Sequence, residues 1–81
     1  MTSSASDEAT LGMKRVGLNF NPSGDGRVTD AKTLGAQLID MCEDLKKASP
    51  GNGEVLRCLA HAQTQFEDAT MWIVKAITKP Q

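Results

Sequence analysis

Two long stretches of the chain carry apolar residues at alternating steps of three and four, the spacing of helices that pack together along one face. The first stretch, 29–49, has its apolar positions at Ala31, Leu34, Leu38, Met41, Leu45 and Ala48. The second stretch, 53–78, has them at Val55, Leu59, Ala62, Phe66, Ala69, Ile73 and Ala76. Each stretch is therefore predicted to be one amphipathic helix.

The short segment between these stretches predicts a tight reversal of the chain. Pro50 cannot continue the hydrogen-bond ladder of a helix, and the glycines on either side of Asn52 allow the backbone to turn. Asn52 can cap the second helix, and Thr29 or Asp30 can cap the first, by accepting bonds from free backbone amides. Two long helices joined by a short polar linker form an antiparallel hairpin.

A shorter helix is predicted ahead of the hairpin, over residues 6–15. Asp7 and Glu8 would lie in its first turn and Lys14 and Arg15 in its last, an order of charges that suits the helix dipole. Residues 1–5 are small and polar and are expected to be disordered. Since no stretch alternates as a strand does, residues 1–81 are predicted to form a single all-α domain.

The predicted hairpin carries more apolar side chains than two helices can bury against each other. Ile39 and Cys42 flank the apolar series of the first helix. The series of the second helix is flanked by Leu56, Met71, Trp72, Val74 and Ile77. The surplus predicts that copies of the chain associate into a homo-oligomer, which would also add to the small core of an 81-residue chain. Gly35, in the middle of the first helix, favours a close approach of another backbone or a ligand.

The charge balance excludes a strongly basic nucleic-acid binder. The formal net charge is -1, from 9 basic and 10 acidic residues, so DNA is not an expected partner. No apolar run approaches the length of a membrane span, and no membrane partner is expected. Cys42 and Cys58 lie within the apolar-periodic stretches and are expected to be reduced core residues of an intracellular protein.

The segment 19–28 interrupts the helical pattern and is the strongest candidate for a ligand loop. Pro22, Gly24 and Gly26 require the backbone to bend there. The loop contains the aromatic ring of Phe20 and the guanidinium of Arg27, and it leads into a helix N-terminus whose amides are free. These features suit a planar, anionic ligand; the alternative is that the segment only turns the chain.

The remaining patterns do not support a metal site or a catalytic site. Cys58 and His61 lie on one helical face, with Cys42 possible across the hairpin, but a closed zinc site needs four ligands. The loop resembles part of a calcium-binding loop but lacks its acidic ligands. No nucleophile lies at a recognisable spacing from a base, so neither an enzyme activity nor a cofactor is predicted.

Three segments of the chain resemble the small phage anti-CBASS sponge proteins, which sequester the cyclic oligonucleotide signals of bacterial immunity. The segments are 15–24 (RVGLNFNPSG), 28–32 with the following Leu38-Ile39-Asp40, and 67–76 with Thr78 and Lys79. The resemblance implies a hexamer of helical hairpins in the cytoplasm of the infected bacterial host. It also implies that pockets shared between subunits bind cyclic dinucleotides without hydrolysing them, and that cyclic trinucleotides bind at separate sites.

The resemblance also implies a set of binding residues. Phe20 would stack on a base, and Lys32 would reach a phosphate or a base edge. The stacking residue of the family is a tyrosine and this chain has none, so Phe20 would stack without a hydroxyl to donate. Charge and position add two arginines, and the predicted ligand-binding residues are Phe20, Asn21, Pro22, Ser23, Lys32, Arg15 and Arg27.

A second function fits the same pattern. The chain would then be an oligomeric helical-hairpin interaction module that docks a partner helix through the face of Trp72 and has no small-molecule ligand. Trp72 lies near the end of the second predicted helix, where Lys75 and Lys79 suit the negative end of the helix dipole.

Overall fold

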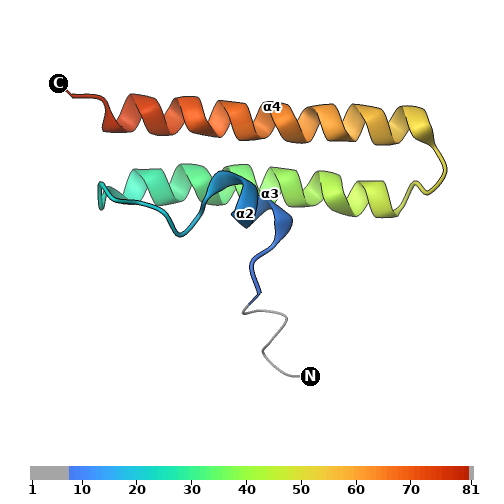
Figure 1. Cartoon of the computed structure of the whole chain (residues 1–81), viewed down its shortest axis with the longest axis horizontal. Helices are drawn as coiled ribbons and strands as arrows, with labels where there is room; N and C mark the ends of the chain where they lie inside the picture. The colour runs from blue at the N-terminus through green and yellow to red at the C-terminus, as the bar shows by residue number, and fades with distance from the viewer. Residues whose placement is uncertain (1–7, 81) are drawn as a thin grey trace.

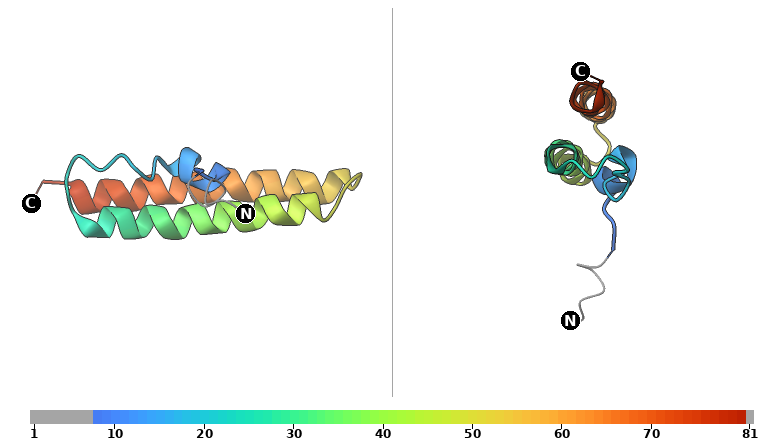
Figure 2. Two further views of the ribbon diagram at one scale, coloured as in Figure 1. Left: turned by 90° about the horizontal axis from the view of Figure 1, so that it is seen from below. Right: turned by 90° about the vertical axis from the view of Figure 1, so that its left-hand side faces the viewer.

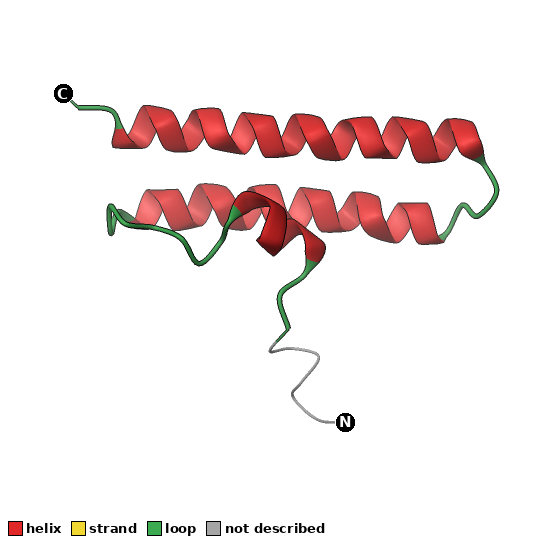
Figure 3. Cartoon of the chain, in the orientation of Figure 1, coloured by secondary structure: helices red, strands yellow, loops and turns green. Residues whose placement is uncertain are grey.

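The computed structural model describes residues 8–80 and contains three helices: α2 over Leu11–Val16, α3 over Gly26–Lys47 and α4 over Gly53–Thr78. The two long helices run antiparallel and side by side, and the short helix lies against them (Figure 1). Helices and loops account for all of the described chain (Figure 3). The predicted all-α class and the predicted hairpin are confirmed, whereas the disordered start predicted for residues 1–5 lies outside the described residues.

The short helix begins at Leu11, not at residue 6 as predicted. Thr10 caps it, because its hydroxyl accepts the backbone N–H of Met13 at 3.1 Å. Glu8 consequently precedes the helix instead of lying in its first turn. Gly17 ends the helix in the left-handed conformation, with φ 66°, which a glycine adopts without steric cost.

The first long helix, α3, begins at Gly26, ahead of the predicted start at residue 29. Its cap is Asp25, whose carboxylate accepts the backbone N–H of Arg27 at 2.9 Å, so Thr29 and Asp30 lie inside the helix. The predicted loop 19–28 is shorter for the same reason, and α3 ends at Lys47 instead of residue 49. The bounds of α4 coincide with the prediction, and Asn52 caps it by accepting the N–H of Val55 at 3.2 Å.

The buried face of α3 is not the predicted one. The predicted series is largely exposed, with Leu34 at 62 % and Met41 at 55 % of their full exposure. The buried residues have the same alternating spacing of four and three, but their series is displaced by one position along the sequence. They are Val28, Lys32, Gly35, Ile39 and Cys42. Both stripes have a helical period, so the period alone could not distinguish the buried stripe from the exposed one.

Small residues explain which stripe is buried. A Cβ atom added at Gly35 would lie 2.1 Å from the hydroxyl oxygen of Thr70 on α4. A Cβ atom added at Gly12 on α2 would lie 2.1 Å from the carbonyl oxygen of Ala36. The close approach predicted at Gly35 is therefore to the side chain of Thr70, and α3 buries the face on which its neighbours can come closest.

The second long helix, α4, meets this face partly through polar side chains. Gln63 is 1 % exposed and donates to the carbonyl oxygen of Ile39 and to a carboxylate oxygen of Glu43, both at 3.1 Å. Among the predicted contact residues of α4, Phe66 is half-buried but Ile73 is exposed. Cys42 is buried as predicted, whereas Cys58 is exposed and the prediction of a core residue was wrong there.

The short helix lies mainly against α3, on one side of the hairpin (Figure 2), and is bonded to both long helices. The backbone N–H of Gly12 donates to the carboxylate of Asp40 on α3 at 2.8 Å, and Arg15 pairs with Glu67 on α4 at 2.8 Å. The common core consists of Val16, Ala36 and Ile39, with Met13, Leu18 and Phe66 packed around it. The chain then runs from α2 to the end of the hairpin where α3 begins and α4 ends (Figure 1).

Candidate functional site

The loop between α2 and α3 is stabilised by its own polar side chains. The amide nitrogen of Asn21 donates to the carbonyl oxygen of Asp25 at 2.9 Å and to the hydroxyl of Thr29 at 3.1 Å. Ser23 donates its hydroxyl to the side-chain oxygen of Asn21 at 2.7 Å. Gly24 has a φ of 72°, whereas Gly26 is already the first residue of α3. These bonds define one loop conformation from the sequence Asn-Pro-Ser-Gly-Asp.

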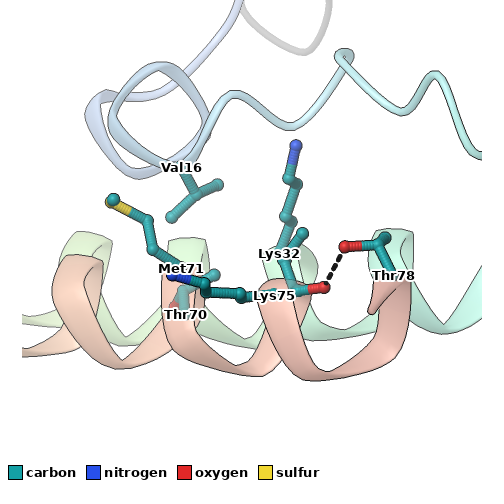
Figure 4. A pocket seen from close by; sticks show the side chains of 7 residues that line it. Val16, Lys32, Thr70, Met71, Lys75 and Thr78 are labelled. Carbon is teal, nitrogen blue, oxygen red and sulfur yellow. Dashed lines mark hydrogen bonds between the residues drawn. The ribbon is translucent and has the colours of Figure 1, made fainter. Parts of the chain in front are cut away.

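Lys32 attaches this loop to α3. Its side chain extends from the helix toward the loop (Figure 4), and the residue is 7 % exposed. The ammonium donates to the carbonyl oxygen of Gly17 at 2.9 Å and to that of Phe20, and it lies 5.5 Å from the centre of the Phe20 ring. These carbonyl oxygens and the aromatic ring stabilise the buried ammonium. The hydrogen bonds from Lys32 in turn hold the loop backbone in position.

Two adjoining hollows lie where the loop and the start of α3 meet the last turns of α4. The first, of about 380 Å³, is drawn in Figure 4, and the second has about 290 Å³. Lys32, Val74 and Thr78 line both. The first hollow lies within the size range of ordinary ligand sites and the second lies just below it. None of the described residues that line them is acidic. Two lysines, Lys32 and Lys75, make this surface positive.

The structure brings most of the predicted site residues together. Phe20, Asn21, Pro22, Ser23 and Lys32 line the second hollow. Phe20 is 70 % exposed, so one aromatic ring remains available for stacking.

The two predicted arginines lie elsewhere. Arg15 pairs with Glu67 and Arg27 with Asp25, and neither residue lines the two hollows. A direct role for them in binding stays a prediction.

The residues that α4 contributes to the hollows were not among the predicted binding residues: Thr70, Met71, Val74, Lys75 and Thr78. Lys75 and Thr78 lie in the segment that carries the family resemblance, but they are more than forty positions from the loop in sequence. The only signal that could have placed them near the loop is the hairpin itself, because an antiparallel pair brings the end of α4 beside the start of α3.

Arg27 stabilises the cap of α3 instead of facing a ligand. Its guanidinium donates to both carboxylate oxygens of Asp25, at 3.1 and 2.7 Å, and its backbone N–H donates at 2.9 Å. These bonds lower the pKa of Asp25 from 3.8 to about 2. The guanidinium of Arg27 makes the largest contribution to this shift, and its backbone amide makes the next largest. Since the folded-state pKa lies below the unfolded one, the stabilisation is present above the unfolded pKa and is lost as pH falls through about 2.

We expect the carboxyl carbon of Asp25 to titrate near pH 2 in an NMR experiment on the folded protein. The substitution Arg27→Gln removes the guanidinium and should move this pKa upward, toward 3.8, while the backbone bond remains. An Asp25 pKa that does not respond to Arg27→Gln would contradict the pairing. Arg57→Gln, which removes an exposed pair with Glu54 on α4, is the matched control and should leave Asp25 unchanged.

Within residues 8–80, no group of three or more histidine, cysteine or acidic side chains could hold a metal ion. Cys42 and Cys58 are free thiols, and His61 lies exposed on α4. In the same part of the chain, no helix is both long enough and apolar enough to cross a membrane.

Comparison with protein families matches residues 13–78 to the family described as Acb2/Tad1, hairpin domain. Comparison with curated proteins and with solved structures gives no significant match. The matched residues include α3, α4, the loop and the last four residues of α2, so the match covers both long helices and both hollows. The chain therefore belongs to the Acb2/Tad1 hairpin-domain family, the family of anti-CBASS sponge proteins.

Proposed function

We propose that this protein sequesters cyclic dinucleotide immune signals, and cyclic trinucleotides at separate sites, without hydrolysing them. In the cytoplasm of an infected bacterium it would thereby block CBASS signalling. The family is one of ligand-binding sponges, not of catalysts. Affinity and slow release then take the place of turnover.

The observation that supports this proposal most directly is the composition of the two hollows. They combine an exposed aromatic ring, two ammonium groups and apolar walls, and no acidic side chain of the described chain lines them. A cyclic dinucleotide presents base faces that stack on aromatic rings and phosphates that bind cations. The ring of Phe20 and the ammonium groups of Lys32 and Lys75 match these two needs.

We further propose that the binding unit is a homo-oligomer, a hexamer as the family resemblance implies. Among the described residues that line the two hollows, each chain offers one exposed aromatic ring, that of Phe20, whereas a cyclic dinucleotide has two bases and two phosphates. Two copies of the pocket related by a two-fold axis would match both halves of the ligand. An exposed apolar stripe on α3 offers a surface for association, and it consists of Leu34, Leu38, Met41 and Leu45.

Calorimetry with a panel of cyclic dinucleotides and trinucleotides tests the proposal. We expect at least one cyclic dinucleotide to bind, and to be recovered intact after the complex is denatured and analysed by chromatography. Hydrolysed ligand would indicate an enzyme. Absence of binding across the panel would overturn the sponge function.

The substitution Phe20→Ala tests the stacking ring. Because base stacking contributes about 1–3 kcal/mol per base, we expect the affinity for the cyclic dinucleotide to fall about tenfold or more. Phe20→Tyr keeps the ring and is the matched control, with affinity expected to be retained. Equal affinities of the wild type and Phe20→Ala would contradict the stacking role.

The alternative is an interaction module without a small-molecule ligand, and the 61 % exposure of Trp72 is the observation that favours it. Substitutions separate the two functions. If Phe20→Ala and Lys32→Glu leave all activity intact while Trp72→Glu abolishes it, the interaction module is correct. Loss of cyclic dinucleotide binding in Phe20→Ala would support the sponge.

A further inference from the structure

We propose that Lys75 on α4 supplies the principal contact to a ligand phosphate, and that Lys32 mainly positions the loop. This inference rests on the proposed function and assigns roles within the same site. It differs from the expectation from sequence, in which Lys32 would reach a phosphate or a base edge and Lys75 would suit the helix dipole. The two roles follow from which side-chain hydrogen-bond donors of the two hollows are still available.

The polar side chains that the loop contributes to the second hollow, those of Asn21 and Ser23, have no donor left for a ligand. Both N–H groups of the Asn21 amide are used, one by the carbonyl of Asp25 and one by the hydroxyl of Thr29. The hydroxyl proton of Ser23 is used by the side-chain oxygen of Asn21. These groups shape the wall of the hollow, but an anion would have to break the loop to gain a bond from them.

The two threonines of α4 that line the first hollow, Thr70 and Thr78, also have no hydroxyl proton left for a ligand. Thr70 donates its hydroxyl to the carbonyl oxygen of Phe66 at 2.7 Å, and Thr78 donates to that of Val74 at 2.9 Å (Figure 4). A hydroxyl has one proton, so each threonine can only accept a further bond. Toward a phosphate, which also only accepts, these two oxygens offer no attraction.

Lys32 has three N–H groups, and two of them already donate to the carbonyl oxygens of Gly17 and Phe20. Its burial makes these bonds costly to give up, because both carbonyl groups and the ammonium would lose their partners. At most one N–H of Lys32 is therefore left for a ligand.

Lys75 is different in each of these respects. It is exposed, it lines the first hollow, and it makes no ion pair with any described residue. Its ammonium lies 5.0 Å from the centre of the Trp72 ring, a contact that places the charge without using a hydrogen-bond acceptor. Lys75 thus has its full set of N–H donors available, in a hollow whose described lining has no acidic residue to neutralise it.

The test compares Lys75→Met with Lys79→Met, using calorimetry with the cyclic dinucleotide that the wild type binds best. Both lysines lie at the end of α4 and both serve the helix dipole, but Lys79 lines neither hollow. We expect Lys75→Met to lose affinity about tenfold or more and Lys79→Met to change it less than about twofold. The affinity of Lys75→Met should also depend less on salt than that of the wild type.

A third variant separates binding from positioning. Lys32→Met is expected to lower thermal stability and to alter the NMR signals of Gly17 and Phe20 without any ligand, whereas Lys75→Met should change neither. The assignment of roles is overturned if Lys75→Met binds as tightly as Lys79→Met, or if Lys32→Met leaves the free loop unchanged. If the wild type itself binds no cyclic nucleotide, the proposed function fails, which is a different outcome.

Discussion

Replacing Gly12 by alanine is expected to separate α2 from α3 and to lower the free energy of unfolding by about 3 kcal/mol. The new Cβ atom would lie 2.1 Å from the carbonyl oxygen of Ala36, which belongs to the helix backbone and cannot rotate away. The hydrogen bond from the Gly12 backbone to Asp40, now 2.8 Å, would lengthen as the helices move apart. Urea unfolding followed by circular dichroism measures the loss.

The control for this substitution is Gly26→Ala at the start of α3. A Cβ atom added there meets nothing within 4 Å, and its backbone does not have a positive φ. We expect Gly26→Ala to leave stability unchanged or to raise it by less than about 1 kcal/mol, because alanine restricts the unfolded chain. Equal stabilities of the two variants would mean that α2 does not pack closely on Ala36.

Introducing a charge at Leu34 is expected to dissociate the proposed oligomer into single chains. The exposed stripe on α3 consists of Leu34, Leu38, Met41 and Leu45, with exposures of 62 %, 37 %, 55 % and 48 %. Burying this stripe against a second copy would remove apolar surface from water, and Leu34→Glu would leave an unpaired carboxylate in the interface. Sedimentation or light scattering gives the mass of each variant.

The monomer should tolerate this change, since Leu34 contacts water in the isolated chain. Thr64→Glu introduces the same charge at an exposed position of α4 outside the stripe and should leave the mass of the oligomer unchanged. The proposal of an oligomer through this stripe is rejected if the wild type has the mass of one chain. It is also rejected if Leu34→Glu has the same mass as the wild type.

The two variants probe parts of the fold that sequence reasoning predicted with different success. The bounds of α4 were correct because Asn52 and Pro80 mark its ends with local chemistry. The start of α3 was wrong because several possible caps lie close together, and Asp25 was favoured by its bonds to Arg27. Such a choice depends on the loop that precedes the helix, which the helical period does not describe.

The candidate site was likewise predicted only in part from the sequence. The loop could be identified from Phe20, Pro22 and the glycines, because the residues that bend the backbone before a helix are neighbours in the sequence. The contribution of α4 could not, because Lys75 and Thr78 approach the loop only when the hairpin closes. The ion pair between Arg15 and Glu67 likewise joins residues that are distant in sequence. Arg15 therefore contacts Glu67 and does not line the predicted site.

By itself, the sequence determined that the chain forms helices, that two of them make a hairpin, and that the hairpin has more apolar surface than it can bury alone. Only the tertiary structure decided which stripe of α3 is buried and which is left exposed. It also decided that Lys32 is held by the loop while Lys75 keeps its donors available. The reason is that helix formation and capping depend on neighbours along the chain, whereas burial and donor satisfaction depend on neighbours in space.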